Sequence, residues 1–363
     1  MTDEHRDGLL AGIRVLDLSI FRPGPYATQL LVEMGAEVVK VEPPGGDPMR
    51  AYPGLFAVLN AGKRSAAVDL KDAAGRAAVL ALAAGADAVI EGFRPGVVAK
   101  LGVDDGAVRQ VNPSVVYCSI SGYGQTGSLV DVPGHDVNYQ AWAGGLEPRA
   151  ANEAPVEGRL PIADLAAGGY AAMAICAALL RRERSGEGEY IDVGMADLVA
   201  SWVGPVTPEL ADVERPAGGM PGYGTFRTGD GGWVALGVIV EDHFWTKLMG
   251  ALGFDDVASL GLAERVSRTT ELNGRIAAAI ARRDRDGLVA DLMAAGVPVS
   301  PILSQAEMLQ VEHFRGRGLV VPGPDGAPAM SHPLRYAHHP ARLPFGAPPL
   351  VEGPDALPAW EPR

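Results

Sequence analysis

The residues best suited to proton transfer lie in a glycine-rich stretch near the middle of the chain. His135 and Asp136 are adjacent in SGYGQTGSLVDVPGHDVNYQAWAGGLEP, residues 121–148. An imidazole has an unperturbed pKa of about 6.5, so it exchanges protons near neutral pH. Glycines let backbone N–H groups approach a ligand closely. This segment therefore favours a catalytic or binding loop; the alternative is a surface loop in which Asp136 only caps a helix.

Two further carboxylates stand at expected helix starts. Asp164 stands at the start of a predicted helix over 163–184, as a natural N-cap. Glu241 follows the predicted strand WVALGVIV. Asp is a common N-cap, so on spacing alone a purely structural role is the simpler interpretation of Asp164. The positive end of the helix dipole would keep its carboxylate ionised, which suits a nucleophile better than an acid. Glu241 can equally be only a first-turn acid of the next helix.

Basic residues gather near strand ends and helix starts in the first half of the chain: Lys40, Lys63, Arg64, Lys71 and Arg94. This is the zone in which phosphate contacts are expected, although solvated surface charge is the default for any one of them. The formal net charge of −13 argues against a broad nucleic-acid surface. An anionic ligand must therefore be held by local basic residues.

The composition is that of a chain with a sizeable packed core. Of the 363 residues, 47% are hydrophobic and 21% are charged. Cys118 and Cys176 lie in apolar segments without metal-ligand spacing, so we expect buried free thiols and no bound metal. The N-terminus lacks an apolar signal-type stretch, and glycines interrupt the most apolar segment, 165–180. We expect a soluble, cytoplasmic protein without a membrane span.

Apolar runs alternate with helical patterns in the first half. We expect strands over 13–18, 36–42, 65–70, 87–93 and 115–121, a helix from Pro25 to Gly35 and another over 72–84. Strand–helix–strand order within about 30 residues indicates parallel strands joined by right-handed crossovers. Such sheets bind ligands at the carboxyl ends of their strands. GxGxxG and GxxxxGK[ST] motifs are absent, so the usual dinucleotide and P-loop signals are missing.

The second half of the chain has a different pattern of strands and helices. A hairpin with its turn at Asp230-Gly231-Gly232 precedes helical patterns over 241–252, 271–282 and 285–295. Pro and Gly are frequent in residues 204–224, and Pro and His are frequent from residue 321 onward. We therefore predict an α/β protein with a large domain 1–203, a linker 204–224, a small α+β domain 225–320 and an arm 321–363 that returns to the large domain.

Several segments in this order and spacing resemble the class III coenzyme A-transferase superfamily, the CaiB/BaiF type, which also contains the α-methylacyl-CoA racemases. They are GIRVLDLSIFRPGPYATQLLVEMGAEVVKVEPPGGD, LNAGKRSAAVDLK, IEGFRPGVVAKLGV, SISGYGQTG, GHDVNYQAWAG, ADLAAGGYAA and RRERSGEGEYIDVGM. The resemblance implies a Rossmann-like large domain and a smaller domain in an interlocked, obligate homodimer. It also implies an acyl-CoA thioester as substrate, so that coenzyme A enters as part of the substrate rather than as a tightly bound cofactor.

The resemblance places the coenzyme A site on the large domain. Arg94, in FRPG, resembles the family's nucleotide-contacting arginine. Two other family arginines are replaced here by Pro43 and Ala61, so we expect nearby basic residues to make the phosphate contacts. The residues expected to contact coenzyme A are Arg94, Lys40, Lys63, Arg64, Gly122 and Tyr139.

The resemblance also implies two possible chemistries. Asp164 matches a carboxylate that family transferases use as nucleophile and racemases use as one of two proton-transfer groups. GHDVNY at His135 is similar to the racemases, whereas related transferases usually carry an aromatic residue at this position. Glu241 matches the glutamate that supports this histidine, and Asp136 completes the expected catalytic set. QAWAGG and the short glycine run after Asp164 are instead closer to transferases.

From this pattern we expect a racemase or epimerase that inverts the α-carbon of a 2-methylacyl-CoA by two-base proton transfer. The alternative is a transferase that moves coenzyme A between carboxylic acids through an aspartyl mixed anhydride. A non-catalytic CoA-binding relative is a third interpretation. The sequence does not determine the acyl group.

Overall fold

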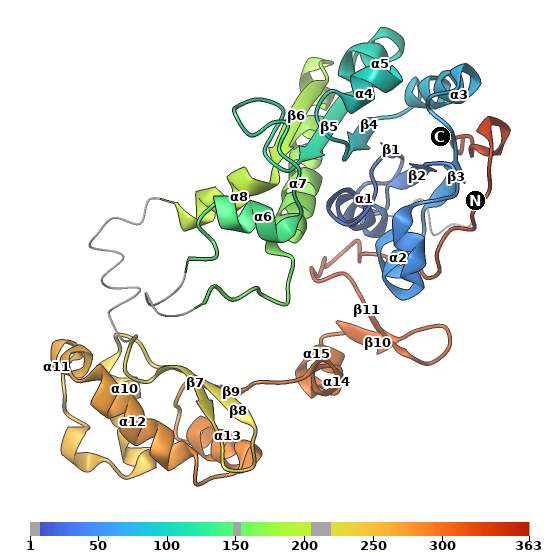
Figure 1. Ribbon diagram of the computed structural model, residues 1–363. Coiled ribbons are helices and arrows are strands. Elements are labelled where there is room, and N and C mark those ends of the chain that lie inside the picture. Colours follow the sequence, from blue (N-terminus) through green and yellow to red (C-terminus); the bar gives the residue numbers. More distant parts are fainter. Residues whose placement is uncertain (1–7, 148–153, 205–218, 363) are drawn as a thin grey trace. The chain divides into compact units, whose positions relative to one another are not determined.

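The first half of the chain builds a parallel six-stranded sheet. The computed structural model describes residues 8–147, 154–204 and 219–362. The strands are β1 Arg14–Asp17, β2 Glu37–Glu42, β3 Arg64–Ala67, β4 Ala88–Glu91, β5 Val116–Ser121 and β6 Glu189–Gly194. They follow the order β3-β2-β1-β4-β5-β6, and every neighbouring pair is parallel (Figure 1). The predicted α/β class is confirmed. The order reverses between β1 and β4, where such sheets bind ligands.

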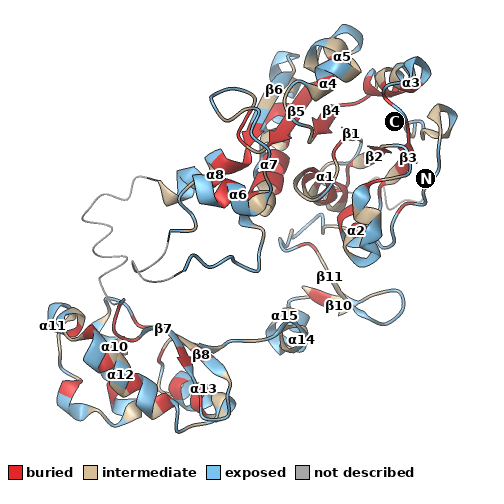
Figure 2. Ribbon diagram, viewed as in Figure 1, coloured by how far each residue is buried: buried red, intermediate tan, exposed pale blue. Residues whose placement is uncertain are grey.

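Helices cover both faces of this sheet, which explains why its strands are apolar on both sides. One face packs against α1 Pro23–Glu33, α7 Ile162–Ser185 and α8 Met195–Val203. The other packs against α3 Ala73–Ala83, α4 Val97–Leu101 and α5 Asp105–Val111. Figure 2 shows buried residues along β4, β5 and one side of α7. The sheet is therefore the centre of a two-sided core.

Helix α7 packs closely on α1. A Cβ atom at Gly168 would lie 2.7 Å from the carbonyl oxygen of Pro23 and 2.7 Å from the ring of Tyr26, so only a glycine permits this approach. The helix has the length and apolar composition of a membrane span, but half of its most apolar window is buried inside the fold. We interpret it as a core helix. Its bounds agree with the prediction over 163–184.

Several short helices were not predicted from the sequence. They are α2 Pro53–Asn60, α4, α5, α6 Asp136–Trp142, α11 Leu262–Ser267, α14 Gln305–Met308 and α15 Glu312–Gly316, together with the 3₁₀ turns η2 Pro48–Ala51, η3 Asp255–Val257 and η4 Pro354–Ala356. Such short segments show too little periodicity for recognition, and α6 lies within the glycine-rich stretch. Helix α1 begins at Pro23 rather than Pro25.

The end of the chain runs along the outer edge of the sheet. A small hairpin, β10 Val320–Pro322 and β11 Pro328–Met330, precedes largely irregular chain. The Ala67 N–H on β3 donates to Val351 O at 2.8 Å, and the Gly353 N–H donates to Ala67 O at 2.9 Å. The indole of Trp360 donates to Leu82 O at 2.8 Å. The arm thus covers backbone groups that an edge strand would otherwise expose.

The chain divides into two compact units. Unit 1 comprises Met1–Glu147, Pro155–Gly204 and Phe314–Arg363, and unit 2 comprises Pro148–Ala154 and Pro205–His313. Unit 2 holds the antiparallel strands β7 Tyr223–Arg227, β8 Trp233–Gly237 and β9 Val299–Pro301, with α10 Asp242–Leu252, α11, α12 Thr269–Ile280 and α13 Arg285–Ala294. The β7–β8 hairpin confirms the predicted turn. Most of the predicted linker, 204–224, lies outside the described residues.

Candidate active site

A pocket opens at the carboxyl ends of the central strands of unit 1. Its volume is about 420 Å³, which is within the usual range for small-molecule sites. It is lined by Ile20, Phe21, Pro23, Gly92, Phe93, Arg94, Pro95, Ile120, Ser121, Gly122, Tyr123, Val130, Val132, Pro133, Gly134, His135, Asn138, Tyr139, Asp164 and Met195. These residues follow β1, β4, β5 and β6 or begin α7, so the pocket lies at the reversal of strand order.

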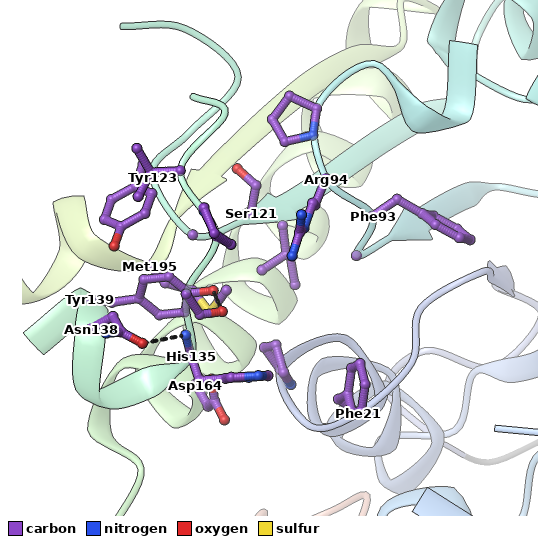
Figure 3. A pocket seen from close by; sticks show the side chains of 18 of the residues that line it. Phe21, Phe93, Arg94, Ser121, Tyr123, His135, Asn138, Tyr139, Asp164 and Met195 are labelled. Atoms are coloured by element: carbon purple, nitrogen blue, oxygen red, sulfur yellow. Dashed lines mark hydrogen bonds between the residues drawn. The ribbon is translucent and has the colours of Figure 1, made fainter. Parts of the chain in front are cut away.

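His135 lies in this pocket at the start of α6 (Figure 3). Its backbone N–H donates to Asn138 Oδ1 at 3.0 Å, which fixes the turn. Its ring meets the edge of Phe21, with 6.4 Å between centroids and an interplanar angle of 86°. Phe21 has a φ of +63°, a left-handed conformation that is rare for an aromatic residue. The loop after β1 therefore places the Phe21 ring beside the imidazole at the cost of an unfavourable backbone conformation.

Asp164 lines the same pocket, but it is not the helix N-cap that we predicted. Helix α7 begins at Ile162, with Pro161 as its N-cap, so Asp164 lies in the first turn. Burial and the neighbouring carboxylate of Asp136 raise the pKa of Asp164 to about 6, against opposing effects of Arg22 and His135. Asp164 therefore still loses its proton by neutral pH, but its pKa is raised rather than kept low by the helix dipole, because desolvation has the larger effect.

Asp136 caps α7 from a distant part of the chain. Its Oδ1 accepts hydrogen bonds from the N–H groups of Ala163, at 2.7 Å, and Asp164, at 3.2 Å. Its Oδ2 accepts from Gln140 Nε2 at 2.6 Å. Asp136 thus satisfies backbone donors of α7, rather than capping its own helix. Its charge also acts directly on the carboxyl group of Asp164.

Gly122 and Tyr139 form one wall of the pocket. A Cβ atom at Gly122 would lie 2.5 Å from the Tyr139 ring, so the glycine makes room for it. The Tyr139 hydroxyl donates to Gly134 O. Burial and the charge of Asp164 raise the pKa of Tyr139 to about 12, so the phenol stays protonated. Gly122 and Tyr139, which we predicted to contact coenzyme A, thus both line the pocket.

Arg94 also lines the pocket, at the turn after β4, and its side chain is exposed. The structure does not bring the other predicted cations to this site. Lys40 is fully buried and pairs with Asp47 at 3.0 Å. Lys63 is buried and donates to Asp17 Oδ2 at 3.2 Å and to Pro25 O at 2.9 Å.

The Arg64 side chain also has its partners within unit 1. It forms an ion pair with Glu37 and donates to Ala359 O at 2.7 Å. Its predicted contact with phosphate, like those of the two lysines, stays a prediction. In all three cases the charged group already has partners within the fold.

Glu241 lies in unit 2, where it is the N-cap of α10. Its Oε2 is buried and has no hydrogen-bond partner among the described residues. The fully buried Arg265 holds the preceding turn, since it donates to Val240 O at 3.2 Å and to Asp242 Oδ1 at 2.7 Å. The predicted support of His135 by Glu241 stays a prediction.

Sequence reasoning missed four lining or neighbouring residues: Phe21, Arg22, Ser121 and Tyr123. The strained backbone of Phe21 has no signal in the residue type. Ser121 and Tyr123 flank a predicted contact, Gly122, and could have been found from their place at the end of a strand. In the parts of the chain that the structure describes, no group of His, Cys, Asp or Glu is arranged to hold a metal ion.

Comparisons with known proteins agree with this geometry. The chain matches the profile of CoA-transferase family III over residues 10–354. It is 33% identical over 375 residues to a succinate–glutarate CoA-transferase of Agrobacterium fabrum, with 93% of each chain covered. It is also 33% identical over 324 residues to the alpha-methylacyl-CoA racemase of Homo sapiens, with 85% of this chain and 81% of the racemase covered.

Solved structures show the same fold. Rv3272 from M. tuberculosis superposes with a TM-score of 0.84 at 31% identity, covering 96% of this chain and 99% of the other. A CAIB/BAIF family protein from Brucella suis superposes with a TM-score of 0.82 at 28% identity, covering 95% and 97%. Sequence profile, relatives and fold all span nearly the full length, so this protein belongs to CoA-transferase family III.

Proposed function

We propose that the protein is an acyl-CoA racemase or epimerase that inverts the α-carbon of a 2-methylacyl-CoA. One observation carries this proposal: His135 and Asp164 line the same pocket, and the pKa of Asp164 is raised to about 6. A carboxyl group with a raised pKa and an imidazole in the same pocket can each take up and release a proton, as inversion in both directions requires.

The mechanism divides the work between the two side chains. One removes the α-proton from one face of the thioester, which leaves an enolate, and the other delivers a proton to the opposite face. Asp136 fixes the first turn of α7 and so positions Asp164. The positive charge of Arg22, which lowers the pKa of Asp164, also favours a negative enolate at this end of the pocket. A supporting role of Glu241 for the His135 imidazole is proposed from the family resemblance alone.

Isotope exchange tests this proposal. A racemase should wash deuterium from the α-carbon of a 2-methylacyl-CoA in ordinary water without any acceptor acid. His135→Ala and Asp164→Ala should each slow exchange from one face by about two to four orders of magnitude. Coenzyme A binding should persist in both variants. Exchange that requires an added carboxylic acid would contradict the proposal.

The relatives favour a second candidate, transfer of coenzyme A between carboxylic acids. Several are CoA-transferases, including an acetyl-CoA:oxalate CoA-transferase of Acetobacter aceti that is 29% identical over 375 residues. In this mechanism the Asp164 carboxylate attacks the thioester carbonyl and expels coenzyme A as a thiolate. The thiolate then attacks the Asp164 carbonyl of this mixed anhydride, which releases the donor acid and leaves an aspartyl-CoA thioester. The acceptor carboxylate attacks that thioester and expels the thiolate again, giving a second mixed anhydride. Attack of the thiolate on the acceptor's carbonyl finally yields the new acyl-CoA and frees the Asp164 carboxylate.

Hydroxylamine separates the two candidates. It traps an acyl anhydride on Asp164, which a racemase does not form. His135→Phe should abolish racemisation, but a transferase should tolerate it because the position then only lines the pocket. Adduct formation together with an active His135→Phe variant would establish transfer and refute racemisation.

We also propose that the protein is an obligate homodimer. Large apolar side chains on α6, α7 and α8 are exposed, among them Trp142, Tyr170, Met173 and Trp202. A patch of this kind usually marks an interaction surface. Sedimentation over a wide range of dilution should reveal no monomer, and a monomer that grows with dilution would contradict the proposal.

A further inference from the structure

Two hydroxyl groups on the pocket wall lack hydrogen-bond partners. Ser121 ends β5, Tyr123 follows two residues later, and both line the pocket. The side chains are buried, with 4% and 8% of their surface exposed. Neither Ser121 Oγ nor Tyr123 OH bonds to any residue that the structure describes, and both oxygens are shielded from bulk solvent.

This is unusual because buried hydroxyls in folded proteins are normally bonded, and an unbonded one destabilises the fold. Other tyrosines of unit 1 follow the rule. The hydroxyl of Tyr139 donates to Gly134 O, and that of Tyr117 donates to Val103 O at 2.9 Å. Two unbonded hydroxyls on one wall of one pocket therefore indicate a site that is completed by a ligand.

The surroundings hold the Tyr123 ring in place. It meets the Tyr139 ring edge to face, with 5.2 Å between centroids and an interplanar angle of 85°. A Cβ atom at Gly134 would lie only 3.2 Å from the Tyr123 hydroxyl, so this glycine leaves room beside it. Burial raises the pKa of Tyr123, so the phenol remains a hydrogen-bond donor at neutral pH.

The position of the pair suggests which part of a ligand it meets. In Figure 3, Ser121 lies beside Arg94, whereas Tyr123 lies against Tyr139, with its hydroxyl near Gly134, the residue before His135. A thioester at His135 and Asp164, with its nucleotide toward Arg94, would run its pantetheine arm between these ends. Serine and tyrosine hydroxyls both donate and accept, which matches the N–H and C=O of an amide.

We propose that Ser121 and Tyr123 bind amide groups of the pantetheine arm of coenzyme A. This inference rests on the proposed acyl-CoA function. The pocket wall between them contributes apolar side chains such as Ile120 and Val130, which suit the aliphatic carbons of the arm. The two hydroxyls thereby become ligand-binding residues that neither racemisation nor transfer requires for its chemistry.

Calorimetric titration with coenzyme A tests the proposal in the full-length protein. Tyr123→Phe and Ser121→Ala should each weaken coenzyme A binding about threefold to tenfold, the loss expected for one neutral hydrogen bond. Ser121→Thr, which keeps a hydroxyl, should retain most of the affinity. Binding of adenosine 3′,5′-bisphosphate, which lacks the pantetheine arm, should not change in any variant.

Thermal unfolding without ligand provides the matched control. Tyr123→Phe should unfold at the wild-type temperature or above, because it removes an unbonded polar group. Tyr117→Phe, remote from the pocket, should unfold at a lower temperature and keep its coenzyme A affinity. A Tyr123→Phe variant that is destabilised like Tyr117→Phe, or unchanged coenzyme A affinity in Tyr123→Phe and Ser121→Ala, would overturn the proposal.

A failure of the proposed acyl-CoA function would give a different result in the binding titration. If the wild type does not bind coenzyme A at all, the acyl-CoA function itself fails, and this inference fails with it. If the wild type binds and the variants bind equally well, only the assignment of the two hydroxyls is wrong. Equal weakening toward coenzyme A and adenosine 3′,5′-bisphosphate would also refute it, because the effect would then not reside in the pantetheine arm.

Discussion

Replacing Asp164 with asparagine should stabilise the folded protein at neutral and alkaline pH while it abolishes catalysis. The pocket raises the pKa of this carboxyl from 3.8 to about 6. The unfolded chain therefore releases the proton near pH 4, whereas the folded protein keeps it until about pH 6. Between these values the folded state binds more protons, so its stability falls as pH rises.

The magnitude follows from the shift. About two pKa units correspond to about 3 kcal/mol in the free energy of unfolding. The wild type has lost this stability above about pH 7, where the folded carboxyl is ionised. Asparagine never carries the charge. The Asp164→Asn variant should therefore be more stable than the wild type by up to about 3 kcal/mol at pH 8, and this gain should fall to a small fraction near pH 4. For a unit of this size the gain in melting temperature is on the order of 6–12 °C.

Thermal unfolding at pH 4.5 and pH 8 measures this difference, with Asp325→Asn as control. Asp325 is an exposed acid in the turn between β10 and β11, and its substitution should give no pH-dependent gain. The reasoning is refuted if Asp164→Asn is no more stable than the wild type at pH 8. An equal gain at both values of pH would also refute it, because the charge effect must shrink as the pH falls toward the pKa of the carboxyl in the unfolded chain.

Other substitutions test the same network. Arg22→Gln should raise the pKa of Asp164 and move the acidic limb of the pH–rate profile upward, whereas Asp136→Asn should move it downward; shifts in the same direction would contradict the assignment. Gly168→Val should lower the melting temperature and slow exchange of the α-proton, because the new Cβ would lie 2.7 Å from the carbonyl oxygen of Pro23 in α1. Lys63→Met should cost about 3–5 kcal/mol in urea unfolding and leave the coenzyme A affinity of the folded protein intact. Lost affinity in a stable Lys63→Met variant would instead favour a phosphate contact.

Much of the sheet could be predicted from the sequence because its strands are short apolar runs between helical patterns. The rule that parallel sheets bind ligands at the carboxyl ends of their strands also predicted the edge of the sheet at which the pocket lies. Lys40 and Lys63 show why position alone is insufficient. Lys40 lies within β2 and Lys63 just before β3, but their partners, Asp47 and Asp17, come from other segments. Residue type does not reveal which cation is paired inside the fold and which faces a ligand.

The capping of α7, rather than its bounds, was mispredicted for a related reason. Asp164 has the residue type of an N-cap, and local sequence contains no sign that Asp136 supplies the cap from another part of the chain. A cap contributed through tertiary contact frees Asp164 from bonding to its own helix. The side chain can then face the pocket, as local capping would not allow.

The same contact also sets the reactivity of Asp164, because the capping carboxylate raises the pKa of its neighbour. A more basic carboxylate is a better proton acceptor and a better nucleophile, so this arrangement serves racemisation and transfer alike. The chemistry must therefore be decided by what else lines the pocket beside Asp164. His135 provides a second proton-transfer group there, held at the start of α6 and beside the Phe21 ring. A mixed-anhydride mechanism has no need of that group, whereas inversion at the α-carbon cannot proceed by proton transfer without it.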